Sequence, residues 1–473
     1  MTVSAIEGPT HRSPDNGPDA GAPTRIAGID VGSNTVRLVI GQVEPDGRVR
    51  VIDDEKEPSE LGRAVFATGR LEPDAIERTA ETIARFAEIA RGFGADPIEA
   101  VATSAVRDAS NADEFTSRVR ALAGVDCRVI SAEEEATLSF RGAAASFDLS
   151  NGPVMLADLG GGSLELVLAI DGEIVQTYPL RLGAVRLTGQ FGGPAACAAD
   201  RYKDLLATID DTLARELATL PFAPRVLLGT GGTFTTLAAI AAGPLDQPQG
   251  AVLTRQQVRG ALDLVRRTPV GRRTRIAGLG KDRAEIILAG AAVVDRLLSS
   301  VDLPELIVHR GGVRTGLLEE LADRLPARAS RPRSGSDPVA ASEELARRLN
   351  ADLTHAAHVA GLADAIWSEL RARAEDPGDP PGAWTTAEAR LLLRCAAILH
   401  DCGYAIGHEG HHRHAEQIIL HASIAGLDAR QRCIVASLAR THRRSEPKAS
   451  HPSYAALDER DRAMVDRLSA ILR

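Results

Sequence analysis

Residues 30–40 have the sequence DVGSNTVRLVI, and residues 158–168 have the sequence DLGGGSLELVL. In both stretches an Asp precedes a glycine turn, and a hydroxyl residue and an apolar run typical of a β-strand follow it. The matching positions are 128 residues apart throughout. This constant offset indicates an internal duplication and predicts two similar domains, each presenting an Asp and a glycine turn.

Strands and helices alternate around both hairpins. Residues 71–94 have the periodicity of an amphipathic helix, and residues 98–103 are typical of a short strand. Asn111 and Glu114 have the spacing of a capping pair that would begin the next helix. Residues 226–242 and 305–324 each pass from a strand pattern through glycines into a helix pattern. This alternation predicts an α/β core.

The composition changes along the chain. Residues 1–24 are rich in Pro, Gly, Asp and Ser, which predicts a disordered tail. Residues 327–338 have the composition of a linker, and the remainder shows no strong strand pattern. The domains expected are domain I over residues 25–137, domain II over residues 138–326, and an all-helical domain over residues 339–473.

The bulk composition excludes several classes of protein. A chain of 473 residues is too long for one ordinary core. The net charge of −9 argues against a general nucleic-acid coat, and no apolar run approaches the roughly 20 residues that span a bilayer. Five scattered cysteines without a CxxC pair fit a reducing compartment. We therefore expect a cytoplasmic protein with neither a nucleic-acid nor a membrane partner.

The paired hairpins are the strongest indication of chemistry. Tight turns without bulky side chains direct several backbone N–H groups at one point, and such nests bind phosphate oxygens. Asp30 and Asp158 could hold Mg²⁺ beside the phosphate, and Glu165 lies on the same side of its strand as Ser163. The alternative is that the glycines only make turns. The candidate phosphate-binding residues are Asp30, Gly32, Ser33, Asn34, Thr35, Gly160, Gly161, Gly162 and Ser163.

Two later loops carry weaker signals of the same kind. Gly229, Thr230, Gly231, Gly232 and Thr233 join a strand to a helix, where the helix dipole favours an anion. Arg314, close to a second glycine pair, could add a phosphate contact. The alternative for the first loop is a tight connection with no ligand.

A candidate base lies between the two hairpins. Ser131 and Glu134 have the spacing of a capping box, which leaves Glu135 free to point elsewhere. A carboxylate there could orient or deprotonate an attacking water, although a solvated acidic face has the same pattern. Arg107, at a predicted strand-to-helix junction, could clamp phosphate or form a surface ion pair.

As an ordered set, five segments resemble the exopolyphosphatase / guanosine-pentaphosphatase family of the actin-like and sugar-kinase superfamily. They are IAGIDVGSNTVRLVI, VATSAVRDA, RVISAEEEATLSFRGA, VMLADLGGGSLELVL and LLGTGGTFTTLAAI. The resemblance implies that domains I and II are duplicated actin-like (ribonuclease H-like) domains. It also implies that Glu135 is the catalytic base, that Asp158 and Glu165 hold the metal, and that Arg107 binds phosphate. Mg²⁺, with Mn²⁺ as the alternative, and a homodimer are implied as well.

Histidines are concentrated in the last domain. His400 and Asp401 follow an apolar helical run, and His358 lies upstream. A His-Asp doublet with an upstream His resembles the metal site of HD-type phosphohydrolases, so these three residues are candidate ligands of a second metal. A relict HD-type fold without metal, or histidines that hold the end of an anionic chain, are the alternatives.

We therefore expect an exopolyphosphatase that removes the terminal phosphate of polyphosphate by Mg²⁺-assisted attack of water. Guanosine pentaphosphate is the nearest alternative substrate. An actin-like ATPase or sugar kinase would share the two hairpins, and a nonenzymatic sensor of polyphosphate or an alarmone would share the binding residues.

Overall fold

The computed structural model describes residues 24–192, 199–242, 249–325, 337–374, 382–422, 424–443 and 445–473. These form two compact units. The first contains both sheets except for residues 169–176, where two strands of the second sheet are joined. The second contains these residues, the short segment 150–152 and the helices from α13 onward. The predicted tail up to residue 23 and the predicted linker up to residue 336 lie outside the described residues.

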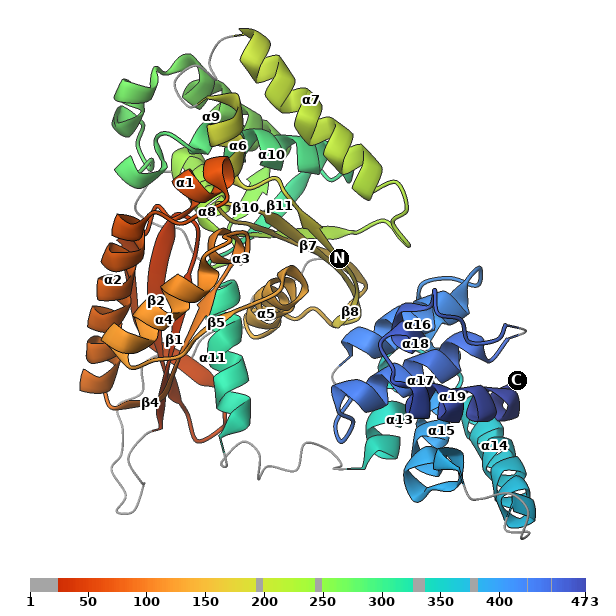
Figure 1. Cartoon of the computed structure of the whole chain (residues 1–473). Coiled ribbons are helices and arrows are strands. Elements are labelled where there is room, and N and C mark those ends of the chain that lie inside the picture. The colour runs from red at the N-terminus through yellow and green to blue at the C-terminus, as the bar shows by residue number, and fades with distance from the viewer. Residues whose placement is uncertain are drawn as a thin grey trace. The chain divides into compact units, whose positions relative to one another are not determined.

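The first hairpin forms the centre of a five-stranded sheet with the order β3-β2-β1-β4-β5. β1 and β2 are antiparallel, whereas β1, β4 and β5 run parallel. Helices α2 and α4 cover one face of this sheet (Figure 1). The bounds are β1 (Arg25–Val31), β2 (Thr35–Val43), β3 (Val49–Pro58), α1 (Gly62–Thr68), α2 (Pro73–Gly92), β4 (Ala95–Ala102), α3 (Ser104–Arg107), α4 (Ala112–Ala123) and β5 (Cys127–Val129).

The opposite face is covered by a helix from much later in the chain. α11 (Val313–Arg324) packs against β1 and β2, and against α5 (Ala132–Ala144) beside them (Figure 1). Leu317, Leu318 and Leu321 of α11 are buried with Ile26 and Val39 of the sheet. α5 also runs through the expected boundary at residues 137 and 138, so the two halves of the first unit share elements.

The second hairpin lies in a six-stranded sheet with the order β10-β11-β9-β6-β7-β8. Its strands carry the largest apolar core, to which α8, α9 and α10 contribute. The bounds are β6 (Pro153–Leu159), β7 (Leu164–Ile170), β8 (Glu173–Leu180), α6 (Ala184–Phe191), α7 (Ala199–Glu216), β9 (Val226–Thr230), α8 (Gly232–Ala242), β10 (Val252–Thr254), α9 (Arg255–Arg267), α10 (Ile287–Ser300) and β11 (Glu305–His309).

The second unit is built from helices, as expected for an all-helical C-terminal domain. Its core lies between α15, α16, α17 and α19. Within the described parts of the chain, every helix is too short or too polar to cross a membrane. The bounds are α13 (Pro338–Arg348), α14 (Leu353–Ala374), α15 (Ala387–Leu399), α16 (His411–His421), α17 (Ala429–Thr441), α18 (Pro452–Ala455) and α19 (Glu459–Leu472).

One capping prediction is confirmed, and a second is confirmed only in part. The Ser131 hydroxyl accepts a hydrogen bond from the Glu134 N–H at 3.1 Å, as the capping pattern predicts. Asn111 is the residue before α4, and its Nδ2 donates to the Glu114 Oε2 at 3.1 Å, so the predicted pair is in contact. The Asn111 side-chain oxygen, however, accepts from the Leu71 N–H at 2.9 Å and does not cap the helix, and its Nδ2 also donates to the Leu71 C=O at 3.2 Å. Asn111 therefore joins the loop before α2 to the start of α4.

Candidate active site

The two duplicated turns have the same internal geometry. The Gly32 N–H donates to the Thr35 carbonyl at 3.0 Å, and the Gly160 N–H donates to the Ser163 carbonyl at 3.0 Å. The turns also lie against each other, since a Cβ on Gly161 would be 2.9 Å from the Cβ of Ser33. The duplication therefore brings two glycine turns together at one place in the first unit.

A cleft of about 110 Å³ lies at this meeting point. It receives residues from both sheets and from the loops after β9 and β11. Of the residues predicted from the sequence, those that line it are Asp30, Gly32, Ser33, Asn34, Thr35, Glu135, Asp158, Gly160, Gly161, Ser163, Thr230, Gly231, Gly232 and Arg314. Most of the site residues predicted from the sequence thus line one cavity.

Three predicted phosphate contacts do not line the cleft. A Cβ on Gly162 would lie 2.1 Å from the Ser104 Oγ and 2.4 Å from the Phe66 ring, so this glycine permits close packing behind the turn. A Cβ on Gly229 would meet the Phe234 ring at 2.3 Å. Thr233 is buried against α10 beside Gly290. For these positions the structure shows a packing role.

The loop after β9 requires glycine at the cleft itself. Gly231 has φ of +99°, a conformation that other residues rarely adopt, and a Cβ there would lie 2.4 Å from the Leu159 carbonyl oxygen. A Cβ on Gly232 would occupy the position of the Arg283 guanidinium. The glycines therefore allow the start of α8 and an arginine to approach the same point.

Glu135 is held by an arginine and is almost fully buried. The Arg107 Nη1 donates to its Oε2 at 2.8 Å and to the Ile130 carbonyl at 3.0 Å. The Arg107 Nη2 lies 4.0 Å from an oxygen of Glu165. Neither Arg107 nor Glu165 lines the cleft directly, so Arg107 lies behind Glu135 and between the two glutamates.

The carboxyl groups of the site have raised pKa values, because they are buried and close to one another. Burial and the neighbouring Asp158 raise the pKa of Asp30 from 3.8 to about 6. Burial raises the pKa of Glu135 to about 7 despite Arg107, and burial also raises the pKa of Asp158. Burial and the charges of Glu135 and Asp158 raise the pKa of Glu165 well above its usual range. Four acidic groups are therefore crowded together, and a cation beside them would favour their ionised forms.

Glu165 and Asp158 fit a divalent metal by their chemistry. Both Glu165 carboxylate oxygens are buried without a hydrogen-bond partner among the described residues. The Ser139 hydroxyl donates to the Asp158 Oδ2, which fixes the orientation of that carboxylate. Mg²⁺ is commonly held by one or two carboxylates, with substrate phosphates and waters completing its shell. An ion held in this way needs no complete cage of protein ligands.

The sequence interpretation missed several residues of the cleft. Arg37, Thr103, Ser104 and Arg283 also line it. Arg37 occupies the position in the first hairpin that Glu165 occupies in the second, so the duplication itself could have indicated it. Burial lowers the pKa of the Arg283 guanidinium, and no local pattern marks this residue.

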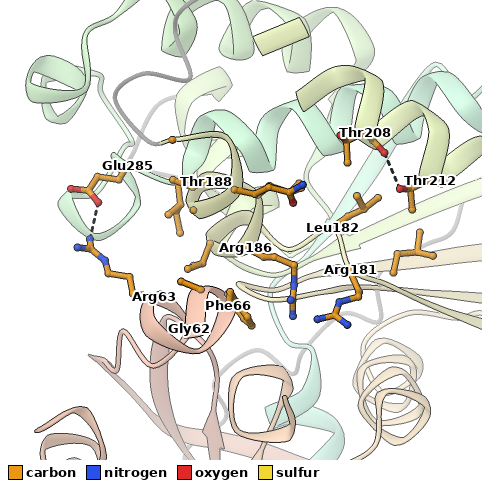
Figure 2. Close-up of a pocket in the computed structure, with 18 of the residues that line it drawn as sticks. Gly62, Arg63, Phe66, Arg181, Leu182, Arg186, Thr188, Thr208, Thr212 and Glu285 are labelled. Carbon is orange, nitrogen blue, oxygen red and sulfur yellow. Dashed lines mark hydrogen bonds and ion pairs between the residues drawn. The ribbon is translucent and has the colours of Figure 1, made fainter. Parts of the chain in front are cut away.

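A second, larger pocket of about 940 Å³ is lined by residues of α1, α6 and α7 and of the segment that leads into α6 (Figure 2). Its wall combines apolar side chains with threonines, and the Arg186 guanidinium lies 4.0 Å above the centre of the Phe66 ring. Phe66 also touches the position where Gly162 lacks a side chain. The second glycine turn therefore separates the cleft from this pocket.

The candidate metal ligands of the second unit are only partly those predicted. His400 and Asp401 lie together, 3.2 Å apart between Nε2 and Oδ2. The third member of their group is His355, one helical turn before the predicted His358. His358 is exposed and belongs to neither group of potential ligands in the described residues.

Two family models cover most of the chain. The model of the Ppx/GppA phosphatase family matches residues 39–325, and the model of domain III of Ppx/GppA phosphatases matches residues 339–473. The chain belongs to the Ppx/GppA phosphatase family. Family members are generally dependent on divalent metal, which agrees with the clustered carboxylates.

Two mycobacterial proteins align with part of this chain over most of their own length. A protein of Mycobacterium tuberculosis named exopolyphosphatase 2 is 33% identical over 317 residues, covering 63% of this chain and 99% of its own. Exopolyphosphatase 1 of Mycobacterium leprae is 31% identical, covering 62% of this chain and 88% of its own.

Solved structures of the family have the same fold. The Aquifex aeolicus Ppx/GppA protein superposes with a TM-score of 0.55 at 31% identity, covering 64% of this chain and all of the other. An exopolyphosphatase from Cytophaga hutchinsonii gives a TM-score of 0.60 at 25% identity, covering 64% of this chain and 99% of its own. These similarities agree with the α/β fold class and the paired actin-like domains expected from the sequence.

Proposed function

We propose that this Ppx/GppA phosphatase is an exopolyphosphatase, which hydrolyses the terminal phosphoanhydride bond of inorganic polyphosphate. The observation that carries the proposal is the cleft in which both acid-led glycine turns and Glu135 meet. Related mycobacterial proteins with about a third of their residues identical are named exopolyphosphatases, which supports the same substrate class.

Glu135 is the group best placed to activate water. In its ionised form it would accept a proton from a water molecule in the cleft, and its contact with Arg107 favours that form. The water oxygen then bonds to the terminal phosphorus, and the bond from that phosphorus to the bridging oxygen breaks. The bonding electrons leave with the shortened chain, and the released phosphate takes the water oxygen.

The remaining residues would bind and orient the phosphates. Backbone N–H groups of the two turns would form anion nests. Arg37, Arg283 and Arg314 line the same cleft and bring positive charge to it. Asp158 and Glu165 would hold Mg²⁺, which offsets the charge on the phosphate oxygens when bound. Arg107 is a positioning residue, because it contacts Glu135 and does not line the cleft.

The test is phosphate release from long-chain polyphosphate by the purified chain with millimolar Mg²⁺. Glu135→Gln should lower kcat by roughly 10²- to 10⁴-fold while polyphosphate still binds, as expected on removing a general base. Glu133→Gln is the matched control, since Glu133 is exposed on the same helix turn. Normal hydrolysis by Glu135→Gln would refute the assignment of the base.

The same assay separates the two other functional classes. Strong turnover of ATP with none of polyphosphate would indicate an actin-like ATPase or a kinase. Tight polyphosphate binding with no turnover of either compound would indicate a sensor. The buried Glu135–Arg107 pair favours hydrolysis, because an unactivated binding site has no need of a buried carboxylate beside its phosphates.

Guanosine pentaphosphate is the second candidate substrate, and the larger pocket favours it. A volume of about 940 Å³ can hold a nucleoside, whereas the cleft of about 110 Å³ cannot. Phe66 and Arg186, which stack on each other, would contact the base, with the phosphates reaching past the second turn. Phe66→Leu should then lower kcat/KM for guanosine pentaphosphate and leave that for polyphosphate unchanged. An equal loss for both substrates would contradict a guanosine site there.

Two further properties stay predictions, the first from the family resemblance and the second from the composition. A homodimer is expected in solution, which light scattering on the full chain would check. A cytoplasmic location is expected, which fractionation of the native cells would check.

A further inference from the structure

Three arginines of the cleft each have an acidic partner that lies outside it. The Arg314 Nη2 is 3.0 Å from the Asp54 Oδ2, and the Arg37 Nη1 is 3.6 Å from the Asp54 Oδ1. The Arg283 Nε is 4.0 Å from the Asp282 Oδ2. The three arginines line the cleft, whereas neither acid is among the described residues that do so. The proposed hydrolysis gives these two acids no role.

The register of the first sheet brings Asp54 to its two arginines. β3 runs antiparallel to β2, and Lys56 lies directly opposite Arg37. Asp54 is two residues from Lys56 along β3, so both side chains are on the same side of the pleat as Arg37. Like charges in directly opposite positions destabilise a sheet, and an acid beside them offsets this repulsion.

Lys56 contacts the other acid. Its Nζ is 2.5 Å from the Asp282 Oδ2, the same oxygen that approaches Arg283. A second ion pair, between Arg63 of α1 and Glu285, joins the same two parts of the chain at 2.7 Å (Figure 2). Asp282 therefore lies between a lysine of the edge strand of the first sheet and an arginine of the cleft.

The three guanidinium groups are close enough to oppose one another's charge. Burial, and next the charge of Arg37, lower the pKa of Arg314 to about 10. Burial also lowers the pKa of Arg283, the charge of Asp282 opposes this shift, and the charge of Arg37 adds to it. An acid behind each guanidinium offsets the repulsion and fixes the direction in which the group points.

The backbone beside Arg283 is held separately from its side chain. Arg273 is fully buried and donates from Nε to the Thr268 carbonyl at 3.2 Å and from Nη1 to the Ala284 carbonyl at 3.0 Å. Gly232 has no side chain where the Arg283 guanidinium lies. The backbone is thus fixed and space is provided, and the direction of the side chain is left to its contact with Asp282.

We propose that Asp54 and Asp282 are positioning residues of the cleft, which direct its three arginines at bound phosphate, and that Lys56 acts through Asp282. These roles presuppose the proposed phosphate cleft and add the groups that orient its cations. The ligand class is inorganic phosphate or the end of a phosphate chain, whose oxygens accept from guanidinium groups.

Charge and orientation predict opposite effects of these acids on phosphate binding. A carboxylate near the cleft repels an anion, so through its charge alone it weakens binding. A guanidinium held in the binding direction loses less freedom when phosphate arrives, so through orientation the carboxylate strengthens binding. The sign of the change on removing the acid therefore decides between the two.

The experiment is calorimetric titration of the full chain with inorganic phosphate at millimolar Mg²⁺. Asp54→Asn and Asp282→Asn should each weaken phosphate binding by roughly 5-fold, as expected on losing a partly exposed ion pair. Tighter or unchanged binding by both variants would overturn the proposal. Asp263→Asn is the matched control, because Asp263 is exposed and pairs with Arg266 at 3.8 Å, and neither residue lines the cleft.

Asp282→Glu keeps the carboxylate and should bind phosphate more tightly than Asp282→Asn does. The reverse order would mean that the acid acts through its charge alone, and would overturn its positioning role. Both changes should fold, because the side chain of Asp282 is 30% exposed.

A double variant tests the role of Lys56. Lys56→Met should weaken phosphate binding by less than Asp282→Asn, and it should add nothing in the Asp282→Asn background. Additive losses would show that Lys56 acts on the phosphate directly and would overturn this part of the proposal.

Phosphate binding requires no turnover, so the titration is independent of the substrate. An unaltered chain that binds phosphate but releases none from polyphosphate would refute the proposed function and leave the roles of Asp54 and Asp282 standing. An unaltered chain that binds no phosphate would remove the cleft on which those roles depend and would overturn them.

Discussion

Replacing Asp30 by Asn should stabilise the protein while it damages the site. The pKa of Asp30 rises from 3.8 to about 6 on folding, mainly because the group is buried and next because Asp158 is near. A raised carboxyl pKa means that the folded state binds the proton more tightly than the unfolded state. The ionised group therefore opposes folding above pH 6, and this cost disappears as the pH falls towards 3.8.

The magnitude follows from the shift. A difference of about 2 pKa units corresponds to roughly 3 kcal/mol of unfolding free energy at pH 8. At pH 5 the folded carboxyl is largely protonated, and the cost falls to about half of that. Asp30→Asn should therefore exceed the unaltered protein in stability by about 3 kcal/mol at pH 8 and by clearly less at pH 5. Phosphate release from polyphosphate should fall in the same variant.

Urea unfolding at the two pH values, without divalent metal, measures this difference. Asp204→Asn is the control, because Asp204 is exposed on α7. Added Mg²⁺ should narrow the gap, since a bound cation stabilises the ionised carboxylates of the unaltered protein. A variant that is less stable than the unaltered protein at pH 8, or a gap that does not change with pH, would refute the electrostatic reasoning.

Three further outcomes can be measured directly. Arg107→Lys should lower kcat for polyphosphate more than it raises KM, because a lysine cannot hold both Glu135 and the Ile130 carbonyl as the guanidinium does; a purely raised KM would contradict this. Gly162→Ala should cost stability and activity together, since its Cβ would lie 2.1 Å from the Ser104 Oγ, and a variant with an unchanged melting temperature would count against the packing. Leu317→Ala, at a fully buried position of α11, should lower the free energy of unfolding by about 2–5 kcal/mol in urea; a loss well under 1 kcal/mol would show that α11 does not carry this core.

The sequence predicted those parts of the site that depend on local geometry. The two turns were predictable because a glycine turn between strands leaves the same mark in both copies. Glu135 could be predicted because Ser131 caps the N–H of Glu134, so Glu135 has no part in the helix cap. The parts of the site that depend on contacts between distant segments could be recognised only in the folded structure.

Arg283 is the clearest example of a site residue that the sequence alone does not predict. It reaches the cleft from a short helical turn more than a hundred residues beyond the second hairpin, and no periodicity marks it. The sequence likewise did not show that His355, and not His358, lies beside the His-Asp doublet. Two residues three apart on a helix lie near the same face, and only the packing of α14 against α15 selects one of them.

The return of α11 to the first sheet has a consequence for how the chain is synthesised. Ile26, Val39 and Val101 form an apolar surface, and most of the side chains packed on it belong to α11, which begins at residue 313. A nascent chain that emerges from the ribosome would carry this uncovered surface for more than two hundred residues of translation. A fragment that stops at residue 137 should accordingly aggregate, whereas one that extends through residue 325 contains everything its first sheet needs.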